Sequence, residues 1–125
     1  MAASAGLSAD ELHEFFIVVN AEHEAAVRER ERIASSLDDI RSGRLDTPAD
    51  DEHDPEGSTM SFEWSRLAGA REDIETLMRT IDATLDRFSA GTYGMCVRCA
   101  LPISKDRLAA RPTAEYCIAC ARLTE

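Results

Sequence analysis

Apolar residues in the first third of the chain recur at alternating steps of four and three, the spacing that places side chains along one stripe of a helix. The stripe consists of Leu12, Phe16, Val19, His23, Ala26, Arg30, Ile33, Leu37 and Ile40. Ser8 and Glu11 stand just before this stripe and have the spacing of a capping box, in which each side chain accepts a hydrogen bond from the backbone N–H of the other residue. Gly43 follows it as a helix C-terminal glycine would, so the pattern predicts one long helix that ends there.

A second apolar stripe begins near Met60 and uses the same steps. It consists of Leu67, Ala70, Ile74, Leu77, Ile81 and Phe88, and it is widened by Met78 and Leu85. Neither helix can bury so narrow a stripe alone, so the two together predict an antiparallel coiled-coil hairpin. His23 and Arg30 interrupt the first stripe, and we expect both at the edge of the seam with their polar groups in water.

The charge of the chain divides it near residue 90. Residues 1–90 hold 21 acidic and 9 basic side chains, a net charge of −12, whereas residues 91–125 hold 3 and 5, a net charge of +2. We therefore expect three parts, namely a flexible N-terminus at residues 1–7, the hairpin at residues 8–90 and a separate module at residues 91–125. A polar, acidic linker at about residues 42–59 would form the tip of the hairpin.

The total charge of −10 argues against duplex DNA or an anionic membrane as the main partner, because affinity for phosphates rests on Lys and Arg. No apolar run approaches the roughly 20 residues that span a bilayer. The N-terminal residues have neither the basic nor the apolar region of a secretory signal. We therefore expect a cytoplasmic protein without membrane association and without direct sequence-specific DNA binding.

The last 35 residues hold two C-x-x-C pairs, Cys96 with Cys99 and Cys117 with Cys120. Two such pairs at this separation supply the four thiolates of a tetrahedral Zn²⁺ site, and a site filled by four cysteines is structural because it leaves no position open for a substrate. A redox dithiol would need an α/β pattern that the sequence lacks, and disulfides disagree with the expected compartment. An iron–sulfur cluster is the remaining alternative. We predict one structural Zn²⁺ whose binding is coupled to folding of the module.

The segment around these cysteines closely resembles the zinc-finger signature of the DksA/TraR family. The resemblance covers residues 93–120, which read YGMCVRCALPISKDRLAARPTAEYCIAC. Between the two cysteine pairs, the positions that match the signature are Ile103, Arg107, Leu108, Ala110, Pro112 and Ala114. The hairpin before the module agrees with the architecture of the family. The resemblance thus implies an all-α-dominated fold, in which the hairpin precedes a small four-cysteine module with a short C-terminal helix.

The resemblance also implies a function. Family members are bacterial transcription factors that bind RNA polymerase directly and place their coiled coil in its secondary channel. Acidic residues at the tip, in the pattern Asp-x-x-Asp-x-Ala, act close to the catalytic Mg²⁺, while the zinc module stays outside. Carried over to this sequence, Asp51 and Asp54 are the main tip residues, and Glu52 and Glu56 are secondary.

The sequence departs from the family pattern at several positions. Ala100 stands where the family usually has a Gly that favours a left-handed turn, so we expect slight strain there. Glu56 replaces the Ala of the tip pattern, and Pro55 beside it cannot sit inside a helix. Asp73 and Thr80 stand where basic residues would be expected for contact with ppGpp, so we expect no strong response to that alarmone.

Two classes of function fit these observations. The first is a non-enzymatic regulator that binds RNA polymerase. The alternative is a zinc-ribbon adaptor that binds another protein or single-stranded nucleic acid through Arg98, Arg107 and Arg111, with the coiled coil as a spacer. An enzyme is not expected, because the tip offers no pocket for a substrate. The prolines and glycine of the linker favour a hairpin within one chain, and hence a monomer.

Overall fold

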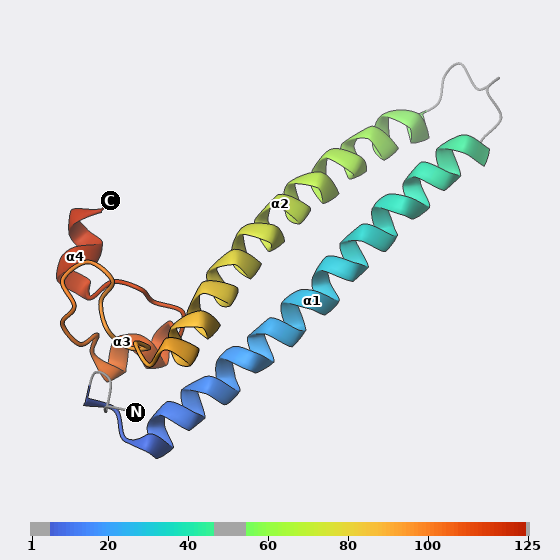
Figure 1. Ribbon diagram of the computed structural model, residues 1–125. Helices are drawn as coiled ribbons and strands as arrows, with labels where there is room; N and C mark the ends of the chain where they lie inside the picture. Colours follow the sequence, from blue (N-terminus) through green and yellow to red (C-terminus); the bar gives the residue numbers. More distant parts are fainter. Residues whose placement is uncertain (1–5, 47–54, 125) are drawn as a thin grey trace. The chain divides into compact units, whose positions relative to one another are not determined.

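The computed structural model describes residues 6–46 and 55–124, and it is all-α (Figure 1). Helix α1 spans Ala9–Asp46, α2 spans Pro55–Ala90, α3 spans Lys105–Ala110 and α4 spans Ile118–Leu123. The predicted hairpin of two long helices, followed by a small module with a short C-terminal helix, is confirmed. The sequence did not lead us to expect α3.

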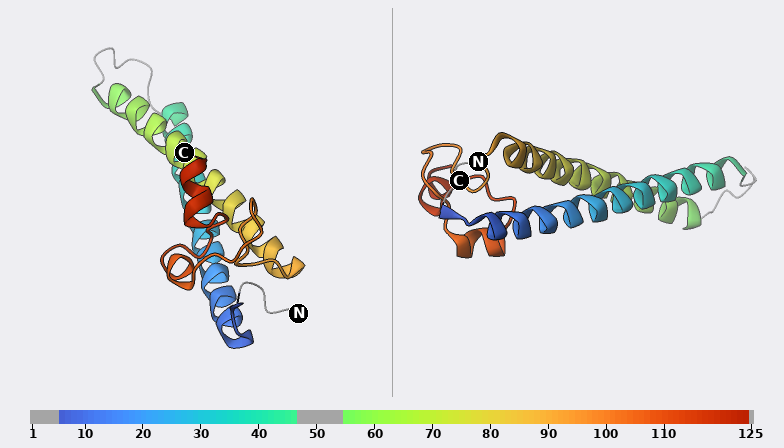
Figure 2. Two further views of the ribbon diagram at one scale, coloured as in Figure 1. Left: turned by 90° about the vertical axis from the view of Figure 1, so that its left-hand side faces the viewer. Right: turned by 60° about the horizontal axis from the view of Figure 1, so that its bottom comes forward.

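The chain forms two compact units, which we describe separately. The zinc unit comprises Met1–Glu24 and Arg79–Glu125, and the hairpin unit comprises Ala25–Met78. In the zinc unit, the early turns of α1 and the last turns of α2 accompany α3, α4 and the loops between them, as two further views show (Figure 2). The division into a hairpin at residues 8–90 and a module at residues 91–125 stays a prediction.

Helix α1 begins as the capping box predicts. The backbone N–H of Glu11 donates to Ser8 Oγ over 3.0 Å, and the backbone N–H of Ser8 donates to Glu11 Oε1 over 2.9 Å. The expected end at Gly43 is wrong, because α1 continues to Asp46. The helix continues through Gly43 although a glycine inside a helix costs about 1 kcal/mol relative to alanine, and a Cβ atom built there would lie 3.9 Å from Met60 Cε of α2.

Helix α2 begins earlier than the apolar stripe indicated, at Pro55 and not near Met60. Proline is well accommodated at the first position of a helix, where its missing N–H would have no partner within the helix. Both helices therefore extend into the stretch that was expected to be loop, residues 42–59.

The hairpin unit is held by a thin aliphatic seam. Its buried residues are Ala26, Ile33 and Leu37 in α1 and Leu67, Ile74 and Met78 in α2. Leu77 was expected in the seam but is 44% exposed, and Met78, one residue later, is buried in its place. Arg30 Nη1 lies 3.9 Å from Glu75 Oε1 with both side chains more than 40% exposed, so Arg30 lies at the edge of the seam as expected.

The zinc unit has a broader core, which gathers residues from distant parts of the chain. The buried members are Leu7, Tyr93, Cys96, Ile103, Leu108, Ala114 and Cys120. Leu7 lies in the segment expected to be flexible, but it is only 2% exposed and joins this core. Periodicity does not predict this position, because a single leucine in a small-residue segment carries no repeating pattern.

Tyr93 is at the centre of the zinc-unit core, with 1% of its surface exposed. Its ring stacks on Phe88 at a centroid distance of 3.9 Å and an interplanar angle of 12°, and it also contacts Phe15 at 5.9 Å. Its hydroxyl donates to the carbonyl oxygen of Pro112 over 2.8 Å. Burial raises the pKa of Tyr93 to about 12, so the phenol stays neutral over the physiological range.

Candidate metal centre

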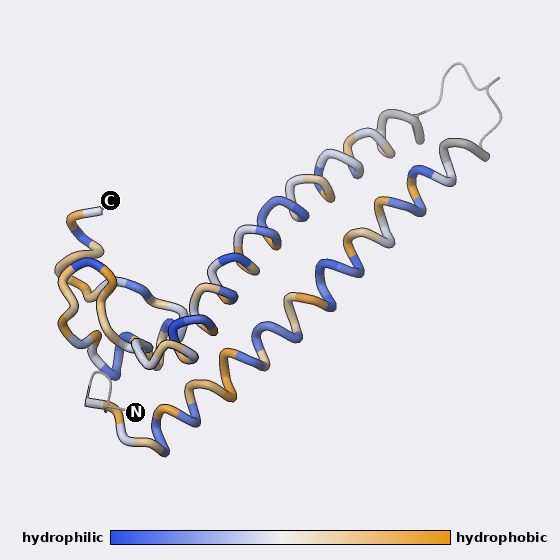
Figure 3. Tube along the Cα trace, in the orientation of Figure 1, coloured by the Kyte–Doolittle hydropathy of each residue, from blue (hydrophilic) through white to orange (hydrophobic). Residues whose placement is uncertain are grey.

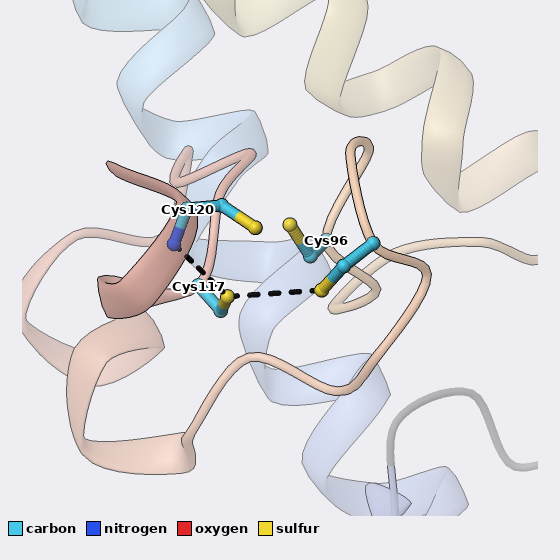
Figure 4. A group of neighbouring side chains, drawn as sticks. Cys96, Cys117 and Cys120 are labelled. Atoms are coloured by element: carbon cyan, nitrogen blue, oxygen red, sulfur yellow. Dashed lines mark hydrogen bonds between the residues drawn. The ribbon is translucent and has the colours of Figure 1, made fainter. Parts of the chain in front are cut away.

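The four cysteines converge on one point of the zinc unit. Their Sγ atoms all lie within 4.8 Å of one another, and Cys99 Sγ is 3.8 Å from Cys117 Sγ. Figure 4 shows the sulfurs of Cys96, Cys117 and Cys120 pointing toward each other, and none of the four cysteines forms a disulfide. A tetrahedral Zn²⁺ with bonds of about 2.3 Å separates its sulfur ligands by about 3.8 Å, so the cluster fits that ion.

A tight turn presents the first cysteine pair. The backbone N–H of Cys96 donates to the Leu101 carbonyl over 2.8 Å, and the N–H of Ala100 donates back to Cys96 over 2.9 Å. Ala100 has a φ of 61°, in the left-handed region that favours glycine. The expectation of a left-handed turn at this alanine is therefore confirmed.

The start of α4 presents the second pair. Cys117 is the N-cap residue of α4, and its Sγ accepts from the backbone N–H of Cys120 over 3.5 Å. Two hydrogen bonds connect the chain on either side of the metal centre. The backbone N–H of Val97 donates to the Glu115 carbonyl over 2.9 Å, and Arg107 Nε donates to the Tyr116 carbonyl over 2.8 Å. These two bonds bring the segments that carry the two cysteine pairs close together.

The local environment changes the acidity of two of the thiols in opposite directions. Burial raises the pKa of the Cys96 thiol, but the backbone N–H groups of Cys99, Cys117 and Arg98 outweigh it and lower the value to about 6. Burial and the neighbouring thiols, Cys117 first, raise the pKa of Cys120 to about 12. The thiols must lose their protons as the metal binds, so metal affinity depends on pH.

The other predicted site residues do not share this geometry. Arg107 is half-buried and its guanidinium holds the Tyr116 carbonyl, so its role includes support of the metal centre. Arg98 and Arg111 are exposed. The acidic tip residues Asp51, Glu52 and Asp54 lie outside the described residues. Glu56 lies in the first turn of α2, and its side chain is also outside the described part of the chain.

The sequence analysis did not predict the contacts of two residues near the centre, Ser104 and Lys105. Ser104 caps α3 by accepting from the backbone N–H of Arg107 over 3.2 Å, which fixes the start of that helix. Lys105 Nζ pairs with Glu11 Oε2 at 3.0 Å and so joins α3 to the first turn of α1. A Ser three residues before Arg107 was a detectable capping signal, but the pairing of Lys105 depends on tertiary structure alone.

A four-cysteine zinc finger joined to a helical hairpin is the class of protein that this fold and site define. Residues 91–125 match the family described as the prokaryotic dksA/traR C4-type zinc finger. The RNA polymerase-binding transcription factor DksA of Haemophilus influenzae is 33% identical over 119 residues, which cover 95% of this chain and 77% of that protein. This chain therefore belongs to the DksA/TraR family.

Two further relatives bear on the fold and the module. The DksA protein of Escherichia coli is 38% identical over 55 residues, 44% of this chain and 36% of that protein. The structure of transcription factor DksA2 from Pseudomonas aeruginosa superposes with a TM-score of 0.79, covering 94% of this chain and 84% of that one at 22% identity. The latter supports the fold alone.

Family and geometry together confirm the prediction of one structural Zn²⁺, which the four cysteines would hold. The expectation of a non-enzymatic protein agrees with the relatives, which are named as transcription factors. Among the residues that the structure describes, no helix combines the length and the apolar character needed to cross a bilayer.

Proposed function

We propose that this protein is a transcription factor that binds RNA polymerase and places the acidic tip of its hairpin in the secondary channel. The observation that carries the proposal is the match over 95% of the chain to a relative named for polymerase binding. The excess of acidic over basic side chains in residues 1–90 suits a channel lined with positive charge, and such attraction weakens as salt rises. The proposal also places the protein in the cytoplasm.

In this function the tip carboxylates act near the catalytic Mg²⁺ of the polymerase. Asp51 and Asp54 change the surroundings of that ion or the movement of neighbouring elements, and Glu52 and Glu56 add to the local negative charge. None of these residues reacts covalently. The zinc unit stays outside the channel and holds the hairpin in place.

The test separates binding from activity. We expect an Asp51→Ala/Asp54→Ala variant to bind core polymerase with nearly unchanged affinity but to lose its effect on open-complex lifetime. The matched control is Asp38→Ala/Asp39→Ala, which removes two exposed carboxylates of α1 outside the tip and should keep activity. If the tip variant keeps full activity, or if the wild-type protein does not bind polymerase at all, the proposal is wrong.

The adaptor function is a second candidate, favoured by the exposed arginines Arg98 and Arg111 and by exposed apolar residues beside the metal centre, such as Val97 at 53% and Leu101 at 63%. An Arg98→Ala/Arg111→Ala variant distinguishes the two. Loss of binding to a partner other than polymerase, with polymerase binding unchanged, would favour the adaptor.

Two further expectations belong to the same proposal. Asp73 is exposed on α2 and Thr80 is half-buried, so neither offers a cation for a phosphate. We expect that adding ppGpp changes the response of polymerase to this protein by less than a factor of about two, an energy below about 0.5 kcal/mol. The protein acts as a monomer, which sedimentation equilibrium would test.

A further inference from the structure

Five consecutive apolar residues in α1, Phe15 to Val19, surround the helix almost completely. Phe15 contacts Tyr93 and Val19 is fully buried, so these two side chains form the side of α1 that packs against the protein interior. Phe16, Ile17 and Val18 are 39%, 53% and 45% exposed, and we call these three residues the outer apolar face. Figure 3 shows the apolar residues gathering in these early turns of α1.

The fold of the zinc unit does not account for this exposure. Phe16 touches Phe88 edge-on at 5.2 Å, but Ile17 and Val18 are absent from the buried core and from the residues packed against it. A single exposed apolar side chain is ordinary, whereas a contiguous group of large ones on a soluble protein marks a surface that another molecule covers.

A hollow on each side of α1 adjoins the outer apolar face. One has a volume of about 410 Å³ and is lined by Leu12, Phe16 and Phe88. The other has a volume of about 400 Å³, and its lining combines Phe15, Val18, Ala109 and Pro112 with the charged residues Glu11, Glu14, Lys105 and Asp106. Large side chains of a partner could therefore enter beside Phe16 and beside Val18, while Ile17 lies on the ridge between them.

The charges around this face have one sign. Residues 9–24 hold five acidic side chains and no Lys or Arg. Asp10, Glu14 and Glu24 are exposed and stand seven residues before, three before and seven after Ile17, so they share its side of the helix. The neighbouring Lys105 already pairs with Glu11. The outer apolar face is thus bordered by an excess of carboxylates.

We propose that the outer apolar face is the docking surface for a basic amphipathic helix of a partner protein. The apolar side of that helix would cover Ile17 and Val18, and its Lys or Arg residues would pair with Asp10, Glu14 and Glu24. A second copy of this chain fits poorly, since it would bring the same carboxylates together, and an anionic membrane is repelled for the same reason. The proposal does not depend on the tip or on the secondary channel.

The test uses the full-length zinc-loaded protein and a synthetic 18-residue helix of leucine and lysine with all leucines on one side. We expect it to bind the wild-type protein, and we expect Ile17→Ser/Val18→Ser to weaken binding by roughly tenfold or more, since each residue buries further apolar area in the complex. Leu77→Ser is the matched control, because Leu77 is 44% exposed on α2 and outside this face. It should leave affinity unchanged.

Charge is tested in the same titration. Glu14→Gln/Glu24→Gln and added salt should each weaken binding severalfold, and a leucine–glutamate helix with the same apolar side should not bind. Equal binding of the two synthetic helices, or equal loss in the Ile17/Val18 variant and the Leu77 control, would overturn the proposal.

Two measurements guard against misfolding and self-association. In wild-type protein labelled at methyl carbons, the leucine–lysine helix should shift the Ile17 and Val18 resonances first, and shifts confined to other methyls would contradict the proposal. A wild-type dimer that Ile17→Ser/Val18→Ser dissociates in sedimentation equilibrium would assign the face to a second copy and so also overturn it.

Discussion

The two units of this molecule are stabilised in different ways. The zinc unit brings together residues as distant in sequence as Leu7 and Cys120, and a metal site lies within its core. The hairpin unit buries one aliphatic stripe per helix, and one of its buried members is as small as Ala26. The stability of the zinc unit therefore depends on a few residues that make long-range contacts or bind the metal. In the hairpin unit, many small contributions along the two helices add up to its stability.

The polar contacts follow the same division. In the zinc unit the Tyr93 hydroxyl reaches Pro112, nineteen positions away. In the hairpin unit, Arg32 with Glu29 and Arg66 with Glu63 pair within single helices, three residues apart, and the exposed pair of Arg30 with Glu75 joins the two helices. Contacts of the second kind contribute little individually, so helix propensity and the seam decide the stability of that unit.

Removal of the metal should produce the largest difference between the units. Structural zinc contributes on the order of 10 kcal/mol in small fingers, so a Cys99→Ser variant or a chelated protein should lose the ordered zinc unit. We expect the tertiary signals of Tyr93 to collapse while much of the helical circular dichroism from the hairpin unit remains. An apo protein with native chemical shifts at Tyr93 would contradict a metal-dependent core.

Truncation of one core residue in each unit gives the next largest effect. Tyr93→Ala should lower the free energy of unfolding by about 3–5 kcal/mol, and Ile74→Ala by about 2 kcal/mol, because the thin seam can collapse around the smaller residue. The control Tyr93→Phe keeps the stack on Phe88 and loses only the hydrogen bond to Pro112, which costs about 1 kcal/mol. Hydrogen exchange should show that each substitution lowers protection in its own unit. Equal losses of unfolding free energy in the two variants would contradict the proposed difference between the units.

A gain of stability is expected at Ala100. Glycine there relieves the left-handed backbone at a φ of 61° and should stabilise the zinc unit by about 1 kcal/mol. Ala109→Gly, inside α3, is the matched control and should destabilise by a similar amount of about 1 kcal/mol. Thermal unfolding of both variants in excess zinc measures the difference, and a destabilised Ala100→Gly protein would show that the turn is not strained.

The smallest effects concern two ion pairs with the same separation. Arg30 with Glu75 and Arg87 with Glu115 both lie at 3.9 Å, but the Arg30 side chain is 42% exposed and the Arg87 side chain only 13%. Double-mutant cycles should give a coupling of about 0.3 kcal/mol for the exposed pair and about 1 kcal/mol for the other. A larger coupling energy for Arg30 with Glu75 than for Arg87 with Glu115 would contradict the expectation that burial strengthens the ion pair of the zinc unit.

The sequence predicted those features that rest on repeating or strongly specific patterns. The heptad stripes predicted the two long helices, the capping box predicted the start of α1, and the paired cysteines predicted the metal cluster. Each of these depends on spacing within a short stretch of chain, where the backbone geometry of a helix or a knuckle fixes which side chains meet.

Features that depend on one unpatterned residue were missed or misplaced. Leu77 and Met78 are adjacent and both apolar, so only the packed hairpin decides that Met78 turns inward. Gly43 carried a helix-ending signal, but α1 continues past it to Asp46. Leu7 has no large apolar neighbour in the next four residues, and its place in the core arises because the zinc unit closes over it.

Lys105 gives the molecule a built-in chemical reporter. It is the single lysine of the sequence, and its ammonium group is held at 3.0 Å from the carboxylate of Glu11. The Lys105 side chain is 55% exposed, so an amine-reactive reagent reaches it in the folded protein, and loss of the pairing with Glu11 should change the rate at which it is modified. A mass increase on the tryptic fragment that contains Lys105 would therefore follow the state of this ion pair, without any engineered label.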